Sequence, residues 1–572
     1  MPRIVVDTDV RLPKRDGVEL AADVYRLERR EPSPVVIHRT PYDRRIASFS
    51  NIPADVLRLV QDGFAVVIED TRGRHGSQGL FTPFTSEESD GGETVAWAAA
   101  EPWSNGRVGM FGASYVGATQ WLAAAAAGDG VQAIAPAISS PDPYRWLYRG
   151  GAFELGFALL WSLMFLAPPN AVRTGGDVAA VLDAADDANE LAGRTPLSGL
   201  PVIADAPWYS DWIERPTYDA VWASVSAAER YAQITAPALI MAGWHDLFLT
   251  GSLASYAGLR SHGGSAAARQ QTRLVVGPWA HGVLGGSFVE RSFGIRAAID
   301  AIDVTGMHSR WFDARLRDGE PLAGKPVLLF VMGPNIWREE DDWPLPDTDF
   351  APWYLHSRGS ANSAAGDGAL SLATPGDEPD DTYLYDPRNP VPTVGGATFL
   401  PGVWLGANAG PRDQSAVERR NDVLCYSSDP LTRPLEVTGP IKLVLFISSS
   451  ATDTDFTGKL VDVGVDGRAE LVTDGILRAR YRDSLSEPER LKPGEPTKIE
   501  LDLGATSYVF PAGHRLRIDV SSSNFPRFDR NTNTGNAIAR EPIEDALVAR
   551  NTIHHHRNHP SHVILPIIER PR

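Results

Sequence analysis

The chain of 572 residues has little sulfur and comparatively little positive charge. Cys425 is the only cysteine, which excludes intrachain disulfides and any cysteine-based metal cluster. Lysine and arginine number 54 against 72 aspartates and glutamates, so the formal net charge is −18. A surface of this sign repels phosphate, so we expect neither nucleic acid nor an anionic membrane as a partner.

Long hydrophobic runs are also scarce. The most apolar window, from Phe157 to Pro168, is too short to cross a bilayer and ends in two consecutive prolines. The first residues contain no basic segment followed by an apolar stretch, so no signal peptide is visible. We therefore expect a cytoplasmic protein with no membrane partner.

Three kinds of pattern divide the chain, which is too long for a single hydrophobic core. Residues 1–141 and 236–350 alternate short apolar runs with helical segments, which is typical of a mainly parallel sheet. Residues 142–235 have helical spacing without strand-like runs and predict an inserted helical cap. Residues 351–572 show short strands separated by Pro, Gly, Asp and Asn turns, which indicates an antiparallel jelly-roll sandwich.

The individual elements follow from the same periodicities. In the α/β region the expected strands are 20–25, 34–39, 63–70, 107–112, 131–138, 238–242 and 273–276. The expected helices there are 54–61, 89–100, 251–259 and 301–316, and those of the cap include 179–192 and 223–231. Strands of the last region include 442–447, 498–503, 515–520 and 562–567.

The segment Gly112–Gly117, of sequence GASYVG, lies between an expected strand and a helix-forming run that begins at Ala118. A strand, a tight corner lined by small residues and a helix lift a serine hydroxyl out of a sheet in a nucleophile elbow. The pattern departs from strict G-x-S-x-G because Val116 stands where the second glycine belongs, and the glycine comes one place later. Ser114 is the predicted nucleophile.

A serine hydroxyl needs a base that accepts its proton and an acid that orients the base. In α/β-hydrolases the acid and the histidine follow the serine in that order, on loops after later strands. Asp246 follows the expected strand 238–242, and His281 follows the strand 273–276. His245 precedes the acid and breaks this order, so we interpret it as a supporting or merely structural residue.

Asp70 closes the expected strand 63–70 and could also be considered as the catalytic acid. It is followed by two arginines, Arg72 and Arg74. A pair of aspartate and arginine after a strand more often fixes a loop, so we favour a structural role for Asp70.

The C-terminal run His554-His555-His556, followed by His559 and His562, raises a metal hypothesis because imidazole is a common Zn²⁺ ligand. Side chains alternate along a strand, so His554 and His556 could converge while His555 points away. No cysteine and no obvious carboxylate lies close by in the sequence. We favour polar residues near a late strand, and we predict neither a metal site nor a cofactor.

Nine short motifs spread over the chain form a specific combination. They are RTPYD (39–43), DTRG (70–73), PWSNG (102–106), GMFGASY (109–115), GWHD (243–246), GPWAH (277–281), WR (337–338), WPLP (343–346) and HPSH (559–562). Together they resemble the CocE/NonD family, the cocaine esterase and X-Pro dipeptidyl-peptidase group of α/β-hydrolases. The resemblance implies an α/β-hydrolase domain, an inserted helical domain, a C-terminal jelly roll and a possible homodimer.

The same resemblance implies the roles of individual residues. Ser114 is the nucleophile, His281 the general base and acid, and Asp246 the carboxylate that orients it. The oxyanion hole implied by the family consists of the Tyr42 phenol and the backbone N–H of Tyr115. Such fixed donors need no solvent reorganisation as charge builds on the carbonyl oxygen.

Two aromatic residues, Trp161 and Phe248, are implied as substrate-binding residues of the pocket. Aromatic side chains offer a large apolar area to an aryl or acyl group. Trp161 also lies in an apolar helical stretch, so it could equally belong to the core of the cap.

The predicted function is a cofactor-independent serine hydrolase that cleaves small-molecule carboxylic esters or amides through an acyl-enzyme. One alternative is an X-Pro dipeptidyl-peptidase, an α-amino-acid ester hydrolase or a β-lactam acylase. The first two must bind a free ammonium, so carboxylates should line the pocket. The acids of the cap, whose directions the sequence does not give, are Asp177, Asp183, Asp186, Asp187 and Glu190. Another alternative is a non-catalytic binding protein, which the presence of all five catalytic and oxyanion residues disfavours.

Overall fold

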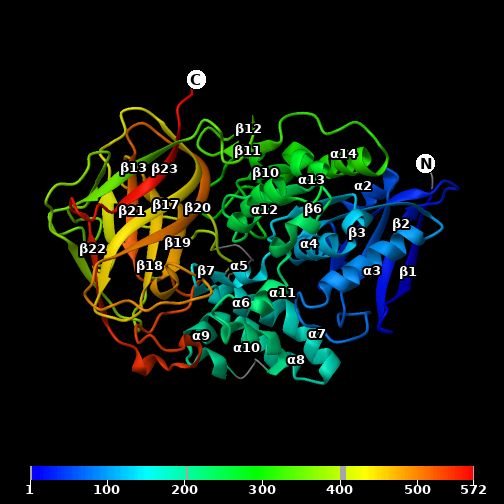
Figure 1. Cartoon of the computed structure of the whole chain (residues 1–572), viewed down its shortest axis with the longest axis horizontal. Helices are drawn as coiled ribbons and strands as arrows, with labels where there is room; N and C mark the ends of the chain where they lie inside the picture. Colours follow the sequence, from blue (N-terminus) through cyan, green and yellow to red (C-terminus); the bar gives the residue numbers. More distant parts are fainter. Residues whose placement is uncertain (1–2, 201–203, 400–407, 571–572) are drawn as a thin grey trace.

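Two sheets and a layer of helices make up the computed structural model, which describes residues 3–200, 204–399 and 408–570. In Figure 1 an α/β domain lies on the right, an all-β domain on the left, and a group of short helices below and between them. The chain enters the α/β domain first, leaves it for the helices, returns to it, and ends in the β domain.

The α/β domain is built on a ten-stranded sheet in the order β1-β2-β4-β3-β5-β6-β9-β10-β11-β12. Neighbours from β4 to β11 are parallel, whereas β1, β2 and β12 pair antiparallel at the two edges. The strands are β1 (Ile4–Pro13), β2 (Glu19–Leu27), β3 (Ser33–Thr40), β4 (Ala65–Asp70), β5 (Ser104–Ala113), β6 (Ala133–Ala137), β9 (Leu239–Gly243), β10 (Arg273–Gly277), β11 (Val327–Val331) and β12 (Ile336–Glu340). The predicted mainly parallel sheet is confirmed.

Helices cover both faces of this sheet, so the central strands are buried on both sides. Side chains of α3, α4 and α12 belong to the core of one face, and those of α2 and α14 to the core of the other. The helices are α1 (Ala47–Ser50), α2 (Val56–Gln61), α3 (Glu87–Ala100), α4 (Tyr115–Ala127), α12 (Leu249–His262), α13 (Ala266–Gln271) and α14 (Val304–Leu316). Short 3₁₀ turns are η1 (Gly128–Gly130), η6 (Ile295–Ala297) and η7 (Ile299–Ile302).

The cap is inserted between β6 and β9 and consists mainly of short helices. They are α5 (Pro143–Leu147), α6 (Leu155–Trp161), the π-helical turn η2 (Ser162–Leu166), α7 (Ala167–Thr174), α8 (Val178–Asp186), α9 (Ala188–Gly193), η3 (Leu197–Gly199), α10 (Pro207–Ile213), α11 (Ala220–Ser224) and η5 (Ala227–Gln233). The single helix expected over 179–192 is in fact two, which meet at Asp187. The cap also contains a small hairpin, β7 (Tyr148–Arg149) and β8 (Ala152–Phe153), that the sequence pattern did not predict.

The apolar stretch of the cap is longer than its sequence window indicates. α6, η2 and α7 form one continuous helical segment of 20 residues, Leu155–Thr174, which contains an 18-residue window with a mean hydropathy of 1.5. The expectation that it is too short to cross a bilayer is therefore wrong on length. In this fold 67% of that window is buried against the rest of the protein, which makes it the central helix of the cap.

The β domain carries the second sheet; among its described residues, the paired strands are antiparallel except β14 with β16. Its strands are β13 (Asp349–His356), β14 (Ala369–Ser371), β15 (Asp381–Tyr385), β16 (Leu424–Ser427), β17 (Leu435–Ser449), β18 (Asp455–Val463), β19 (Ala469–Arg478), β20 (Thr497–Phe510), β21 (Arg515–Ser521), β22 (Ala549–His554) and β23 (His562–Ile568). Three 3₁₀ turns are η8 (Ala479–Tyr481), η9 (Ile538–Arg540) and η10 (Ile543–Asp545). A mostly antiparallel C-terminal domain agrees with the sequence pattern.

The cap is fastened to the β domain at its β7–β8 hairpin. Gly150 and Gly151 have positive φ values, and a Cβ at either would collide with Ile476 or with the ring of Tyr481. Glycine is required there because the two backbones approach each other closely. Just beyond, the buried Glu154 at the start of α6 pairs with Arg527 of the β domain at 3.3 Å. These contacts fix the direction of α6, which carries Trp161.

Candidate active site

Ser114 stands at the corner between β5 and α4 with a strained backbone. Its φ is 60° and its ψ is −125°, a conformation that a residue with a Cβ rarely adopts. A Cβ at Gly112 would collide with Val116, and one at Gly117 would collide with Ser139. The structure therefore explains why the second glycine of the motif is shifted. The position that cannot carry a side chain is Gly117, three residues after Ser114, because it faces Ser139. The corner is a nucleophile elbow.

The serine, histidine and aspartate lie in one hydrogen-bonded line. His281 Nε2 is 3.1 Å from Ser114 Oγ, and His281 Nδ1 is 3.0 Å from Asp246 Oδ2. Because Asp246 accepts at Nδ1, the ring carries its proton there and its Nε2 is free to accept from the serine hydroxyl. The side chain of Asp246 is fully buried and that of His281 is 11% exposed. The predicted spatial arrangement of these three residues is confirmed.

Neighbouring parallel strands bring these residues together. Asp246 and His281 follow β9 and β10, which pair in register, and Ser114 follows β5 two strands away. All three residues therefore lie at the carboxyl ends of the central strands, on the same side of the domain. The second carboxylate oxygen of Asp246 accepts the backbone N–H of Phe248 at 2.7 Å, which fixes its orientation.

Tyr42 lies in the turn after β3, and its side chain extends towards Ser114. Its hydroxyl accepts the indole N–H of Trp161 at 3.1 Å and lies close to the Ser114 side chain. Burial raises the pKa of the Tyr42 phenol to about 12, although the neighbouring Trp161 and Ser114 side chains act in the opposite direction. The phenol therefore stays protonated at neutral pH, as a donor to an oxyanion must.

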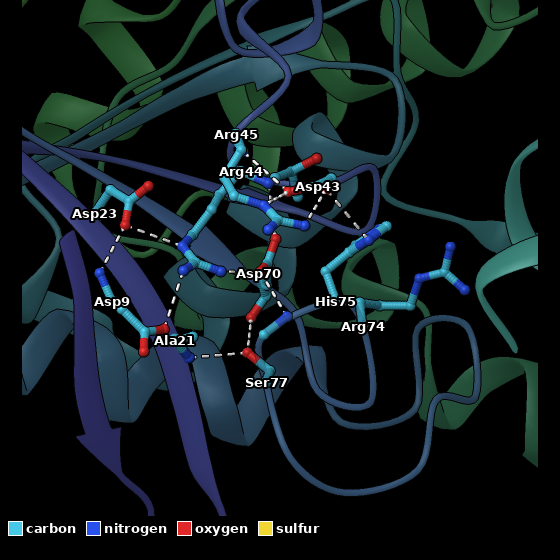
Figure 2. A network of polar contacts seen from close by, with 12 residues as sticks. Asp9, Ala21, Asp23, Asp43, Arg44, Arg45, Asp70, Arg74, His75 and Ser77 are labelled. Atoms are coloured by element: carbon cyan, nitrogen blue, oxygen red, sulfur yellow. Dashed lines mark hydrogen bonds and ion pairs between the residues drawn. The ribbon is translucent and has the colours of Figure 1, made fainter. Parts of the chain in front are cut away.

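The turn that carries Tyr42 is fixed by the buried carboxylate of Asp70, seen at the centre of Figure 2. One oxygen of Asp70 accepts the backbone N–H of Arg44 at 2.7 Å, and the other accepts its guanidinium at 2.5 Å. Arg44 also donates to Asp23 at 3.1 Å. The structural role favoured for Asp70 is confirmed, but its partner is Arg44 and not one of the arginines that follow it in the chain.

Arg74 joins the Tyr42 turn to the cap. Its side chain runs away from the carboxylate network in Figure 2 and donates to the carbonyl of Pro41 at 2.9 Å. It also donates to the carbonyls of Phe165 and Leu166, both at 2.9 Å, in the π-helical turn. Burial of the guanidinium lowers its pKa to about 10, so it remains a cation at neutral pH, close to the Tyr42 phenol.

Tyr115 contributes its backbone and not its phenol. It is the first residue of α4, so its N–H has no acceptor within the helix and points towards the corner. Its phenol lies elsewhere, donating to Glu87 at 2.9 Å and accepting the N–H of Phe84 at 2.8 Å. The amide of Tyr115 and the phenol of Tyr42, the predicted oxyanion donors, are thus both next to Ser114, and their role in catalysis stays a prediction.

The two predicted pocket aromatics both contact the catalytic groups. Phe248 presents its ring edge-on to His281 at 5.1 Å between centroids. Trp161 is only 3% exposed and stacks on Trp212 in the core of the cap, while its indole N–H reaches Tyr42. Trp161 therefore belongs to the core of the cap, and direct contact of either ring with substrate stays a prediction.

Sequence reasoning missed Phe399, which the β domain contributes. Its ring packs edge-on against His281 at 5.3 Å, on the same histidine as Phe248. It also meets Phe157 of α6 at 6.1 Å. No motif marks Phe399, because it lies far along the chain in another domain and only folding brings it to the site.

His245 takes no part in the hydrogen-bonded line. Its ring packs between Phe288 at 5.2 Å and Phe293 at 5.8 Å. Burial lowers the pKa of His245 to about 3, so the ring is neutral. The interpretation of His245 as a structural residue is confirmed.

The acids of the cap named as candidates for ammonium binding are all exposed. Asp177 caps the N-terminus of α8 by accepting the N–H of Ala180 at 3.1 Å, and Glu190 pairs with Arg194 at 2.7 Å. None of them contacts the catalytic residues in the part of the chain that the structure describes.

A serine at a strained elbow, an aligned histidine and aspartate, and two donors beside the serine define a serine hydrolase of the α/β-hydrolase fold. Comparisons with known proteins narrow this class. Residues 16–283 match the X-Pro dipeptidyl-peptidase (S15 family) profile, and residues 323–564 match the X-Pro dipeptidyl-peptidase C-terminal non-catalytic domain. The chain is 45% identical to the cocaine esterase of Rhodococcus sp. (strain MB1 Bresler) over 99% of both chains.

Solved structures agree with these matches. An α-amino acid ester hydrolase has a TM-score of 0.81 at 26% identity, covering 99% of this chain and 97% of that one. A CocE/NonD family hydrolase from Staphylococcus aureus has a TM-score of 0.70 at 18% identity, covering 99% and 94%, which supports the fold. The chain belongs to the CocE/NonD family, and it is a serine esterase of that family.

Proposed function

We propose that this esterase hydrolyses neutral esters of small carboxylic acids, with a preference for aryl esters, through an acyl-enzyme on Ser114. The observation that carries the proposal is the hydrogen-bonded line from Ser114 through His281 to Asp246. The rings around that line support an aromatic ligand, since Phe248 and Phe399 both pack on His281. Cocaine, the ester in the name of the Rhodococcus relative, belongs among the substrates to test.

Each step uses a group already in place. Ser114 Oγ attacks the ester carbonyl while its proton passes to His281 Nε2, and Asp246 stabilises the resulting imidazolium. The oxyanion of the tetrahedral intermediate accepts from the Tyr42 phenol and the Tyr115 N–H. His281 then returns the proton to the leaving alcohol, which leaves the acyl group on Ser114. Water, deprotonated by His281, attacks the acyl-enzyme and releases the acid and the free serine.

An aryl ester should be hydrolysed faster than a dipeptide anilide. We expect kcat/KM on p-nitrophenyl acetate or butyrate to exceed that on Ala-Pro-p-nitroanilide by at least about 10². The reason is that the rings on His281 suit a neutral ligand, whereas the peptide requires carboxylates for its ammonium. Release of nitrophenol and of nitroaniline is followed on the same protein stock. Faster turnover of the anilide would assign the chain to the peptidases.

One second candidate rests on a specific observation. The structural likeness to an α-amino acid ester hydrolase extends over 99% of this chain. That class of activity needs an anionic site for the ammonium group of its substrate. In the part of the chain that the structure describes, the rings that contact the triad and Tyr42 include Trp161, Phe165, Phe248 and Phe399. The charged side chain close to Tyr42 is the Arg74 cation, which would repel an ammonium.

Two methyl esters that differ only in the α-ammonium group separate the candidates. Methyl phenylacetate and phenylglycine methyl ester offer the same ring and the same scissile bond. We expect kcat/KM for the amino ester to be no higher than for methyl phenylacetate, because the described rings on His281 are uncharged and Arg74 near Tyr42 is a cation. Product acids are quantified by chromatography, with background hydrolysis subtracted. A preference of tenfold or more for the amino ester would favour the second candidate.

Three further expectations rest on sequence or family resemblance alone. Hydrolysis of amides, a homodimer and a cytoplasmic location remain predictions for this chain. The hydrogen-bonded triad itself argues against a non-catalytic binding protein, since a decayed site has no selection for such geometry.

A further inference from the structure

A group of histidines at the edge of the β domain meets a carboxylate that comes from a distant part of the chain. β22 ends in His554, and β15, the edge strand of the sheet, pairs with it antiparallel with Asp381 opposite Ile553. Continuing this register places Asp380 opposite His554. The carboxylate of Asp380 is accordingly 2.8 Å from His554 Nδ1. Asp380 is far from these histidines in the sequence, so only folding brings a carboxylate to them.

The alternation of side chains after β22 sorts the histidines into two groups. His555 turns inward, is fully buried and bonds to Asp381 at 2.8 Å. His556 returns to the side of His554, as the strand period predicts. One donor atom from each of Asp380, His554 and His556 lies within 4.8 Å of the other two.

A fourth donor stands beside this group. The backbone N–H of His559 donates to the carbonyl of His556 at 2.9 Å. This turn places the His559 ring beside the His556 ring. His559 Nδ1 is then 3.2 Å from His556 Nε2, and the His559 and His554 rings are 5.6 Å apart.

We propose that Asp380, His554, His556 and His559 bind a Zn²⁺ ion. One carboxylate and three imidazoles are a ligand set that suits this borderline cation, which takes nitrogen and oxygen ligands at about 2.0–2.2 Å in a tetrahedron. Tetrahedral ligand atoms at that distance lie about 3.4 Å apart. The two contacts of 2.8 Å and 3.2 Å in the group are close to this spacing. The donor atoms of Asp380, His554 and His556 lie within 4.8 Å of one another, so binding of the ion requires these side chains and His559 to move closer together.

The surroundings fit the bound ion. Ser448 Oγ lies 3.0 Å from His554 Nε2 and holds that ring with Nδ1 towards the site, as the outer partners of zinc ligands commonly do. Binding through His556 Nε2 places a proton on its Nδ1, which requires only the loss of a long 3.3 Å contact from the Asn558 N–H. Asp380 is exposed, and His556 and His559 are half-buried, so an ion has access.

The position of the site assigns it a structural role. In Figure 1, β22 lies at the left edge of the molecule, whereas α5, α6 and α12 of the catalytic region lie near the centre. The ion would link the segment before the edge strand β15 to the turn between β22 and β23. Such a link protects an exposed sheet edge and stabilises the folded β domain.

Titration of the full chain with ZnCl₂ tests the proposal. The protein is purified without a polyhistidine tag, treated with a chelator and dialysed. We expect one equivalent of Zn²⁺ to bind with a Kd of about 1 µM or tighter by calorimetry, and Tm to rise by about 3 °C or more at saturation. Mg²⁺ should shift neither measurement, since it prefers oxygen ligands.

Variants locate the bound ion. Asp380→Asn replaces an exposed side chain and His556→Gln a half-buried one. Each should weaken Zn²⁺ binding by at least about tenfold. The Tm of each variant without metal should stay within about 2 °C of that of the parent. Asp377→Asn, in the same loop, and His262→Gln, on the exposed end of α12, serve as matched controls and should bind as the parent does. No saturable binding at 100-fold excess of metal, several equal weak sites, or unchanged affinity in both site variants would overturn the proposal.

Discussion

Replacing Ser114 with alanine should lower kcat on p-nitrophenyl butyrate by about 10⁴ to 10⁶ while the fold stays intact. The triad acts as a unit, so the loss of its nucleophile removes nearly all of the chemistry that His281 and Asp246 support. Alanine keeps a Cβ, so the backbone strain at φ 60° is unchanged and no new collision arises. Initial rates, circular dichroism and Tm are measured on the same preparations.

Ser89→Ala is the matched control, because its hydroxyl is exposed on α3 and lies outside the site. It should retain the rate of the parent. A serine-reactive fluorophosphonate should modify the parent protein once, on the peptide that contains Ser114, as detected by mass spectrometry. It should not modify the Ser114→Ala variant. Retained esterase activity in Ser114→Ala, beyond what wild-type contamination explains, would remove this serine from the mechanism.

Replacing Tyr42 with phenylalanine should lower kcat by about 10² to 10³ and leave KM nearly unchanged. The phenol donates to charge that exists only in the transition state, so its loss raises the barrier without weakening the binding of the ester ground state. The change also leaves the Trp161 indole N–H without its acceptor, which affects folding stability more than KM. Full kinetic curves are needed, since a single substrate concentration cannot separate kcat from KM.

Tyr354→Phe controls for the loss of a phenol, since this tyrosine lies on β13 of the β domain and packs on His562. It should be as active as the parent. An unchanged kcat in Tyr42→Phe, or a loss carried entirely by KM, would mean that Tyr42 is not an oxyanion donor.

The raised pKa of Tyr42 predicts how kcat depends on pH in the alkaline range. Because burial raises it to about 12, the donor form persists through the alkaline range and is lost only as the pH approaches that value. Deprotonation of Tyr42 therefore should not lower kcat between about pH 8 and pH 10. Rates over this range, corrected for spontaneous ester hydrolysis, check the expectation. A fall in kcat that is present in the parent and absent in Tyr42→Phe would contradict it.

Much of the catalytic centre followed from local sequence, since each catalytic residue stands directly after a strand. The apolar runs predicted β5, β9 and β10, and parallel strands end at a common edge, so Ser114, Asp246 and His281 could be placed together. The helical character of the cap and the antiparallel character of the β domain also followed from periodicity. The short β7–β8 hairpin did not, because two-residue strands carry no periodic signal.

The residues around the catalytic line depended on contacts between domains. Phe399 reaches His281 from the β domain, and Arg74 joins the Tyr42 turn to the π-helical turn of the cap. Asp70 pairs with Arg44, although Arg72 and Arg74 are its nearer neighbours in sequence. Each of these contacts joins segments far apart in the chain, and sequence spacing gives no distance between such segments.

The amino-acid sequence by itself determined the elbow at Ser114, the order of the triad and the three-part organisation, because strand periodicity and strand-end motifs are local properties of the chain. Only the tertiary structure decided which side chains surround the triad and that Asp380 meets the C-terminal histidines. The physical reason is that a side chain's surroundings depend on how whole layers pack, and a one-residue change in register would bring a different carboxylate or ring to the same place.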